Sequence, residues 1–389
     1  MAKCETKMQT QLIKLVRDIY TTNEFIPLHA PVFMGNEQAY LAETINSTFV
    51  SSVGKFVDEF EQKIQDFTRT ARAIATVNGT ATLHTALHLA GIQAGDLVLT
   101  QALTFVATCN ALYHMGAKPV FIDIEPNAFG LCPQATSLWL SENAVLNADG
   151  QCRHKQSDAA IKAIMPMHTF GHPVQLDELL LICQDWNLVL IEDAAESLGS
   201  YYKGQHTGTL GCFGTLSFNG NKVITTGGGG MLLCREEEDG IRAKHVTTTA
   251  KAPHAYEFYH DEAGFNYRMP NLNAALGCAQ MEQLEIILAN KRVIAGRYAE
   301  FFENSEYRFV VEPEYAYSNY WLNAIVCPDL ETRNALLETT NAQGVMTRPV
   351  WQLMHRLPMF ADALRGDLTN SEWAEARLVN LPSSVFPEN

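Results

Sequence analysis

Short apolar segments alternate with helix-length segments between residues 73 and 191, and this alternation limits the possible folds. The apolar segments are four to seven residues long and suit buried strands: 73–77, 97–100, 118–124, 160–165 and 188–191. Helices are predicted between several of them, at 81–90, 104–115 and 176–185. Regular strand–helix alternation is typical of α/β proteins, so we predict a mainly parallel, doubly wound sheet.

The segments outside this alternation predict helices near the N-terminus and one further strand. Residues 1–25, 37–48 and 56–67 have helical spacing, and the apolar stripe of the last segment is expected to pack in the core. Residues 231–234 suit another strand. Residues 129–163 are predicted to be irregular, and residues 245–263 to form a loop.

The C-terminal part of the chain has a different pattern of predicted helices and strands. Helices are predicted from residue 272 to 289 and on to 302, followed by short strands at 309–311, 323–326 and 345–349 around a helix at 332–343. We therefore predict a large α/β domain with an N-terminal helical segment at residues 1–265. Residues 266–389 would supply linking helices and a small α+β domain.

Composition argues against several classes of partner. The chain has 389 residues and a net charge of -15, whereas nucleic acids and anionic membranes attract basic surfaces. No apolar run approaches the roughly 20 residues that span a bilayer. The nine cysteines are scattered without a Cys-x-x-Cys pair, which predicts reduced thiols, no metal site and a cytoplasmic protein.

Lys222 lies between Ser217 and four consecutive glycines that end at Gly230. Four glycines in a row lose much backbone entropy on folding, which favours a backbone that passes close to something else. A lysine held there is a candidate for Schiff-base formation with an aldehyde cofactor. A surface lysine beside a flexible loop is an equally good interpretation of this stretch alone.

Asn78-Gly79-Thr80 joins a predicted strand to a predicted helix, and such a turn can bind phosphate with free helix amides. An ordinary helix cap by Thr80 is the commoner alternative. Phe105 opens a later helix, where its ring could lie on an aromatic ligand, although core packing is the better interpretation for this residue by itself.

Acidic residues follow the predicted strand 188–191, in the order Glu192-Asp193-Ala-Ala-Glu196. Ligands of open α/β sheets bind at the carboxyl ends of strands. A carboxylate buried there needs a cation or a hydrogen-bond donor, so we favour a ligand-facing acid over a solvated turn. Together, the lysine, the acid, the phosphate donors and the aromatic ring meet the needs of pyridoxal 5'-phosphate chemistry.

From about residue 25 to 385, the chain resembles the DegT/DnrJ/EryC1/StrS sugar aminotransferases. These enzymes have fold type I. Five motifs carry the resemblance: Asn78-Gly-Thr-Ala-Thr-Leu, Thr104-Phe-Val-Ala-Thr, Glu192-Asp-Ala-Ala-Glu-Ser, Ser217-Phe-Asn-Gly-Asn-Lys, and Gly264-Phe-Asn-Tyr-Arg-Met with Asn273-Ala-Ala-Leu-Gly. It implies that Lys222 binds the aldehyde and moves a proton, that Asp193 pairs with the ring nitrogen and that Phe105 stacks on the ring. It also implies a phosphate site made of Gly79, Thr80 and Ser217.

The resemblance further implies a homodimer with shared active sites, in which Asn266 reaches the phosphate of the neighbouring subunit. Glu196 stands where many relatives have Gln or His near the cofactor hydroxyl, so the sequence departs from the family pattern there. Candidate contacts to the nucleotide sugar, each equally open to a structural role, are His29, Lys55, Trp321, Arg348 and His355.

Motifs such as Phe25-Ile-Pro-Leu-His-Ala-Pro and Trp351-Gln-Leu-Met-His are similar to enzymes of bacillosamine and legionaminic acid pathways. This similarity implies amination at C4 of a UDP-linked 4-keto-6-deoxy-N-acetylhexosamine with glutamate as donor. A sugar 3-aminotransferase and a GDP- or dTDP-sugar 4-aminotransferase stay open. A dehydratase on the same scaffold is disfavoured by the lysine at 222, a non-catalytic regulator by the full residue set, and a phosphate-loop nucleotide module by glycines that follow the lysine.

Overall fold

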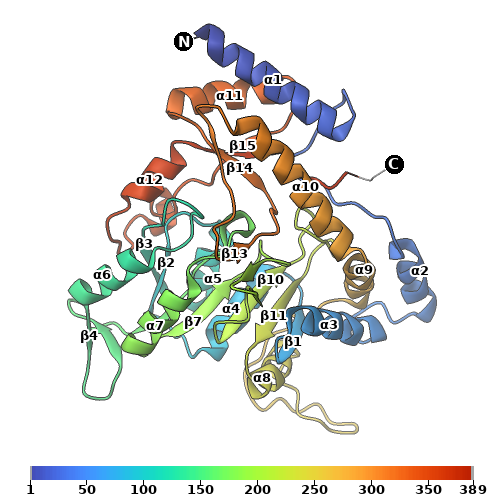
Figure 1. Ribbon diagram of the computed structural model, residues 1–389. Helices are drawn as coiled ribbons and strands as arrows, with labels where there is room; N and C mark the ends of the chain where they lie inside the picture. Colours follow the sequence, from blue (N-terminus) through green and yellow to red (C-terminus); the bar gives the residue numbers. More distant parts are fainter. Residues whose placement is uncertain (1, 387–389) are drawn as a thin grey trace.

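A computed structural model describes residues 2–386, with side chains from residue 7 onward (Figure 1). Seven strands form the central sheet: β1 (Arg72–Thr76), β2 (Leu97–Gln101), β3 (Lys118–Ile122), β6 (Ile161–Ile164), β7 (Val189–Asp193), β10 (Phe213–Ser217) and β11 (Gly230–Cys234). Their order is β1-β11-β10-β7-β6-β2-β3. The pairs from β10 to β3 are parallel, and β11 is antiparallel to both its neighbours. The predicted mainly parallel α/β sheet is confirmed.

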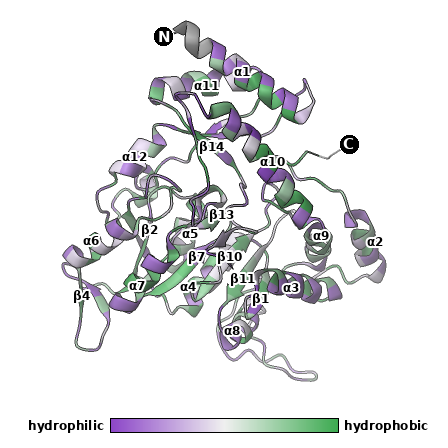
Figure 2. Cartoon of the chain, viewed as in Figure 1, coloured by the Kyte–Doolittle hydropathy of each residue, from purple (hydrophilic) through white to green (hydrophobic). Residues whose placement is uncertain are grey.

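Helices cover both faces of this sheet. One face packs against α4 (Gly79–Leu89), α5 (Val106–Met115) and α8 (Glu237–Thr247). The other packs against α3 (Lys55–Thr68), α6 (Pro133–Asn143), α7 (Leu176–Trp186) and α9 (Asn271–Met281). Strands buried on both sides are almost continuously apolar, and Figure 2 shows this as green along the central strands.

Alternate residues of one strand enter different cores. Ile74 and Val98 pack in the core beneath α4 and α5, whereas their neighbours Ala73 and Leu97 pack in the cores on the opposite face. This is the two-residue period of a strand, and it fixes which strand-end side chains meet which helix ends.

A second, four-stranded sheet lies in the C-terminal part, in the order β12-β14-β16-β15. Its strands are β12 (Arg308–Phe309), β14 (Asn323–Val326), β15 (Arg348–Pro349) and β16 (Leu378–Leu381), joined by α11 (Leu330–Ala342) and α12 (Thr369–Glu375). The long helix α10 (Leu284–Phe302) follows α9 and leads into this sheet.

The first helix, α1 (Ala2–Tyr20), packs on α11, as Figure 1 shows, and α2 (Glu37–Ser47) packs on α9. Leu12 and Val16 of α1 share one core with Tyr298 and Leu336. The N-terminal helix thus contributes to the small sheet's core, and the division of the chain at residue 265 stays a prediction. Within the described residues, no helix has both the length and the apolar character needed to cross a membrane.

Several elements differ from the sequence prediction. Residues 129–163, predicted to be irregular, contain α6 and the hairpin of β4 (Ala144–Leu146) and β5 (Cys152–His154). Pro133 at the first turn of α6 and the buried Trp139 and Leu140 stabilise that helix although most of its residues are polar. The central strand β10 and the helix α8 were not predicted either. Gly214 in β10 weakens the strand signal, but a Cβ there would lie 2.0 Å from the Gly208 carbonyl oxygen.

The remaining elements are short. They are the strands β8 (Tyr201–Tyr202), β9 (Gln205–His206) and β13 (Ala316–Tyr317), which form a three-stranded sheet, and the 3-10 helices η1 (Thr169–Gly171), η2 (Met354–Arg356) and η3 (Pro358–Phe360).

Candidate active site

A cavity of about 280 Å³ lies at the carboxyl ends of β7 and β10, beside the first turn of α4. This is the edge at which open α/β sheets bind ligands. Eight of the residues singled out from the sequence line it: Gly79, Thr80, Phe105, Asp193, Glu196, Ser217, Lys222 and Trp321. Residues from widely separated parts of the chain therefore meet in one space.

Asp193 is the last residue of β7, and its side chain is buried. One carboxylate oxygen, Oδ2, accepts a hydrogen bond of 2.7 Å from the Thr108 hydroxyl, and Oδ1 accepts one of 3.2 Å from the Ala195 amide. Burial raises the pKa of this carboxyl, and the hydrogen bond from Thr108 opposes the rise. Among the described residues, no basic side chain forms an ion pair with it, so a cationic N–H donor in the cavity would find a buried anion.

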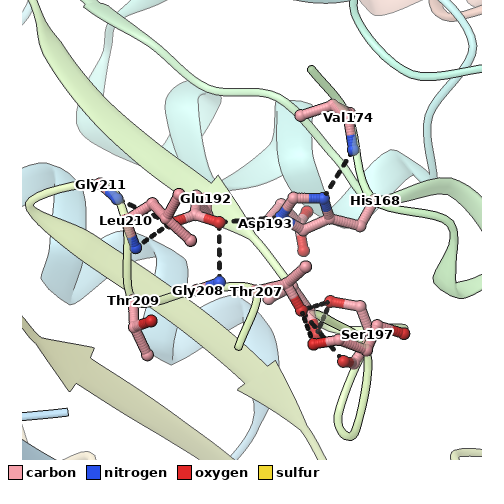
Figure 3. Close-up of polar contacts among 12 residues, drawn as sticks. His168, Val174, Glu192, Asp193, Ser197, Thr207, Gly208, Thr209, Leu210 and Gly211 are labelled. Carbon is pink, nitrogen blue, oxygen red and sulfur yellow. Dashed lines mark hydrogen bonds and ion pairs between the residues drawn. The ribbon is translucent and has the colours of Figure 1, made fainter. Parts of the chain in front are cut away.

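The neighbouring carboxylate, Glu192, faces the other way (Figure 3). It accepts hydrogen bonds of 2.7 to 2.8 Å from three backbone amides in residues 208–211, and one of 3.0 Å from His168 Nε2. The other ring nitrogen of His168 accepts from the Val174 amide. Burial alone would raise the pKa of Glu192, but these hydrogen bonds outweigh burial and leave the pKa lowered. Glu192 thus fixes the loop behind β7, while Asp193 faces the cavity.

Lys222 follows β10 in a tight turn, with its amide 3.0 Å from the Asn219 carbonyl oxygen. The amine lies between two walls. Its Nζ is 3.5 Å from Glu196 Oε1 and 4.0 Å from the centroid of the Trp321 ring. The side chain keeps 12% exposure, so the amine is confined but reaches the cavity.

Glu196 is fully buried, and its second oxygen accepts a hydrogen bond of 2.9 Å from the Phe170 amide. Burial raises the pKa of this carboxyl to about 7, and the nearby Lys222 amine opposes the rise. A carboxyl with this pKa can hold or release a proton near neutral pH, directly beside the lysine amine.

The opposite end of the cavity offers hydrogen-bond donors. The Asn78 side chain caps the Ala81 amide at 2.8 Å, and the first amides of α4 have no acceptor within the helix. Gly79 faces Ser217, and a Cβ on Gly79 would lie 3.0 Å from Ser217 Cβ and 3.2 Å from its Oγ. The missing side chain keeps this donor-lined recess open for an anion.

Phe105 is not a core residue. It is the N-cap of α5, 46% of it is exposed, and its ring lies 6.2 Å from that of Trp351 across the cavity wall. The interpretation of Phe105 as core, favoured for this residue taken alone, is wrong, and its ring face is available to a planar ligand.

Different structural constraints favour glycine at the four consecutive positions 227–230. Gly227 has a φ of +79°, and a Cβ on Gly229 or Gly230 would lie 2.3 or 2.2 Å from a threonine hydroxyl. Close backbone packing, as predicted, therefore explains two of them. A Cβ on Gly228 would meet no atom within 4 Å, and this glycine lines the cavity.

The other predicted site residues lie outside the cavity lining. Asn266 is exposed and accepts hydrogen bonds from Arg268. Lys55 forms an exposed ion pair with Glu43, and Arg348 donates to Asn341 on the surface.

Two predicted substrate contacts are histidines outside the lining. Neither ring nitrogen of His29 has a partner among the described residues, and burial lowers the pKa of this imidazole well below its usual value, as do the nearby charges of Lys291 and Lys222. His355 lies in η2, where burial and two arginines lower its pKa.

Several residues at the site were not identified from the sequence. Thr108 belongs to the same motif as Phe105, three residues on, and this spacing on one helix face could have shown it. Asn219 and Asn221 lie shortly before Lys222 in the sequence, and Trp351 belongs to a motif quoted for another reason; all three line the cavity. Their local patterns carry no chemical signal.

The donor set fits pyridoxal 5'-phosphate. Within the part of the chain that the structure describes, Asp193 is a buried carboxylate without an ion-pair partner, Gly79 leaves a recess that a side chain would fill, and Lys222 is an amine at the same cavity. These are the groups that a protonated ring nitrogen, a phosphate and an aldehyde require.

Comparisons with known proteins agree. The model of the DegT/DnrJ/EryC1/StrS aminotransferase family matches residues 33–386. EpsN of Bacillus subtilis (strain 168) is 36% identical over 342 residues, which are 87% of this chain and 84% of EpsN. GDP-perosamine synthase of Escherichia coli O157:H7 is 34% identical over 366 residues, 94% of each chain. In fold, the crystal structure of the aminotransferase TlmJ from Streptoalloteichus hindustanus is similar, with a TM-score of 0.83, 24% identity, and coverage of 92% of this chain and 93% of TlmJ.

Proposed function

This chain belongs to the DegT/DnrJ/EryC1/StrS aminotransferase family, and we propose that it transfers an amino group from glutamate to C4 of a UDP-linked 4-keto-6-deoxy-N-acetylhexosamine. Family membership makes it a pyridoxal phosphate-dependent nucleotide-sugar aminotransferase. The observation that carries its chemistry is the convergence of Asp193, Lys222 and the phosphate donors on one cavity.

We propose that Lys222 binds the cofactor aldehyde and moves protons, and that Asp193 keeps the ring nitrogen protonated. Phe105 would contact the ring face, and the recess of Gly79, Thr80 and Ser217 would hold the phosphate. When bound, the cofactor supplies an electron-poor ring that stabilises negative charge on a substrate carbon.

Lys222 has the position of a proton carrier. Its free amine lies 3.5 Å from Glu196 Oε1, and this carboxyl can exchange a proton near neutral pH. In the first half-reaction glutamate would leave as 2-oxoglutarate. In the second, the keto oxygen of the sugar would leave as water, and the Lys222 amine would deliver a proton to the sugar carbon that receives nitrogen.

A homodimer with shared sites is part of the proposal. Among the described residues, the cavity lining has no basic side chain apart from Lys222, so the phosphate recess is short of positive charge. Asn266 is exposed, outside its own cavity, and follows a hairpin whose side chains Tyr256, Phe258 and Tyr259 are 63 to 82% exposed. A second copy would cover these aromatic rings and could bring its Asn266 to the recess.

Borohydride reduction followed by peptide mass analysis tests the anchor. The wild-type protein should retain the cofactor on the peptide that contains Lys222, as should Lys203→Ala, which changes an exposed lysine. Lys222→Ala should lose both the label and the visible absorbance. An unchanged spectrum in Lys222→Ala would exclude Lys222 as the anchor.

A panel of UDP-, GDP- and dTDP-linked 3-keto and 4-keto sugars, with glutamate as donor, tests the substrate. The UDP-linked 4-keto-6-deoxy-N-acetylhexosamine should give the highest kcat/KM. A GDP-linked 4-keto sugar is the second candidate, because the similar protein from Escherichia coli is named GDP-perosamine synthase. Preference for the GDP sugar would replace the proposed substrate and keep the reaction.

Mixing two inactive variants tests the shared site. If Asn266 serves the neighbouring subunit, mixed dimers of Lys222→Ala and Asn266→Ala contain one site with neither change, and activity should return on mixing. No recovery in dimers that are shown to exchange subunits would contradict sharing. Sedimentation of an active monomer would contradict the dimer itself.

A further inference from the structure

The two walls beside the Lys222 amine come from distant parts of the chain. Glu196 lies in the turn after β7 of the large sheet, and Trp321 lies just before β14 of the small sheet. Because the amine fits between them, something must keep the two walls at a fixed separation. One side chain, Asn319, contacts the backbone of both.

Asn319 uses both ends of its amide for this contact. Its Nδ2 donates to the carbonyl oxygens of Glu196 and Leu198, each at 2.9 Å, and its Oδ1 accepts from the Trp321 amide at 2.8 Å. The side chain is completely buried. Two carbonyls on one side and an N–H on the other fix the orientation of the amide, so no other common side chain of this shape satisfies all three groups.

The space around Asn319 is also fixed. A Cβ on Gly171 would lie 1.9 Å from Asn319 Oδ1, and Gly171 has a φ of +97°. The Gly171 carbonyl oxygen accepts from the hydroxyls of Ser200 and Ser318, and the Ser200 hydroxyl in turn accepts from the backbone N–H of Asn319. The segments that contain Gly171, Ser200 and Ser318 therefore pack closely around Asn319.

The two residues that follow Asn319 are also held in fixed positions. Tyr320 has a φ of +47°, an unfavourable conformation for a tyrosine that persists only where surrounding contacts impose it. The Trp321 carbonyl oxygen accepts from the fully buried Lys291 amine at 3.0 Å, and its indole N–H donates to the Asn221 carbonyl oxygen at 2.7 Å. Since Asn221 directly precedes the lysine, the indole ring is fixed relative to the backbone of Lys222.

We infer that Asn319 is a positioning residue for the Lys222 amine, because it ties the Glu196 turn to Trp321 and so sets the gap that confines the amine. The inference rests on the proposed function only in taking Lys222 as the reactive amine. It assigns Trp321 to the lysine side of the cavity, in contrast to the sugar contact expected from the sequence. Asn319 itself does not line the cavity.

Competitive acetylation of the full-length protein tests this inference. The protein is stripped of cofactor by dialysis with phenylhydrazine, or supplied with pyridoxamine 5'-phosphate, and both preparations leave the Lys222 amine free. Peptide mass analysis then gives the acetylation rate of Lys222 relative to the exposed Lys14 of the same molecule. Asn319→Ala should raise this ratio about fivefold or more, the scale of losing one net hydrogen bond.

Asn290→Ala is the matched control. Asn290 is also buried, and its amide makes two hydrogen bonds, both to the Phe386 backbone and away from the cavity. This variant should lower thermal stability without changing the Lys222-to-Lys14 ratio. A merely structural role for Asn319 predicts the same pattern in Asn319→Ala, so an unchanged ratio there overturns the inference.

Ser200→Ala keeps the test decisive if Asn319→Ala does not fold. It removes the hydroxyl that accepts from the backbone N–H of Asn319, while Ser318 still donates to Gly171. The ratio should rise by a smaller factor, and a wild-type ratio overturns the inference. The borohydride experiment judges the proposed function separately: unlabelled Lys222 with a changed acetylation ratio would reject the cofactor anchor and keep the positioning role.

Discussion

Replacing Asp193 by asparagine separates the chemistry of this carboxylate from its place in the fold. The structure can accommodate the Asp193→Asn change while both present hydrogen-bond partners of the side chain are kept. The amide oxygen can accept from the Ala195 amide, as Oδ1 does now at 3.2 Å. The amide nitrogen can donate to Thr108 Oγ1, whose own proton can turn to Thr104 Oγ1 at 2.8 Å.

The expected changes therefore have opposite signs. Burial raises the pKa of Asp193, so ionising it in the cofactor-free protein is unfavourable, and the neutral amide should leave the free energy of unfolding unchanged or slightly higher. With cofactor bound, the same change removes the anion from a buried charge pair. Breaking such a pair costs about 3 to 5 kcal/mol, which is about 10²- to 10⁴-fold in rate if the pair supports the transition state.

Single-turnover conversion of glutamate, followed by absorbance, gives the rate, and urea unfolding of cofactor-free protein gives the stability. Asp123→Asn is the matched control. Asp123 is a buried aspartate whose oxygens accept from the Asn370 and Ser371 backbone amides, remote from the cavity lining. It should lose stability and keep the rate. A rate for Asp193→Asn within a few-fold of wild type would refute the pairing of Asp193 with a ring cation.

Three further changes address the remaining parts of the site. Glu196 has a folded pKa of about 7 against an ordinary 4.5, so the native protein binds more protons than the unfolded chain in this window and loses stability as pH rises through it. Glu196→Gln should remove about 2 kcal/mol of that dependence in urea unfolding of cofactor-free protein at pH 5 and 7.5, and an equal loss of stability between the two pH values in variant and wild type would contradict the shift. Gly228→Ala should unfold at the same or slightly higher urea concentration but bind the cofactor more weakly in fluorescence titration, because its methyl group meets only cavity space; unchanged affinity would place the ligand elsewhere. Glu192→Gln should lower the free energy of unfolding by about 3 to 5 kcal/mol, since an amide NH₂ would face backbone N–H groups, and a wild-type melting curve would contradict the loop-anchoring role.

Residues whose chemistry is local were predictable from the sequence. A strand followed by Asn78-Gly79-Thr80 and a helix predicts an anion-binding turn within a few residues, and the lysine stretch ending at Gly230 has its own signature. The structure places Thr80 and Lys222 at the same cavity.

Residues that act through tertiary contacts were not predictable. Thr108 donates to Asp193 across 85 residues, and Asn319 donates to Glu196 across 123. A threonine in a helix and an asparagine before a strand are ordinary by themselves, and no periodicity indicates which distant groups they meet.

Strands, too, were predictable where their own sequence carries the signal and were missed where tertiary packing decides. Strands with continuous apolar sequence, such as β2, were predicted almost to the residue, because burial on both faces leaves a strong signal. β10 lies in the middle of the sheet but contains Gly214, which the close approach of Gly208 requires and which local propensity disfavours. The strand that positions Ser217 was therefore missed for a packing reason.

The alternation of side chains along β7 explains why only one carboxylate of the adjacent pair Glu192 and Asp193 faces the cavity. Ile191 packs in the core beneath α4 and α5, and so does Phe213 of the neighbouring strand. The two-residue period then sends Asp193 and Ser217 to that same face, where the first turns of α4 and α5 begin. Glu192 must point to the opposite face, where it holds the loop 208–211. A shift of β7 by one residue would exchange the two carboxylates, so the strand register that the apolar residues of β7 and β10 impose decides which carboxylate reaches the cavity.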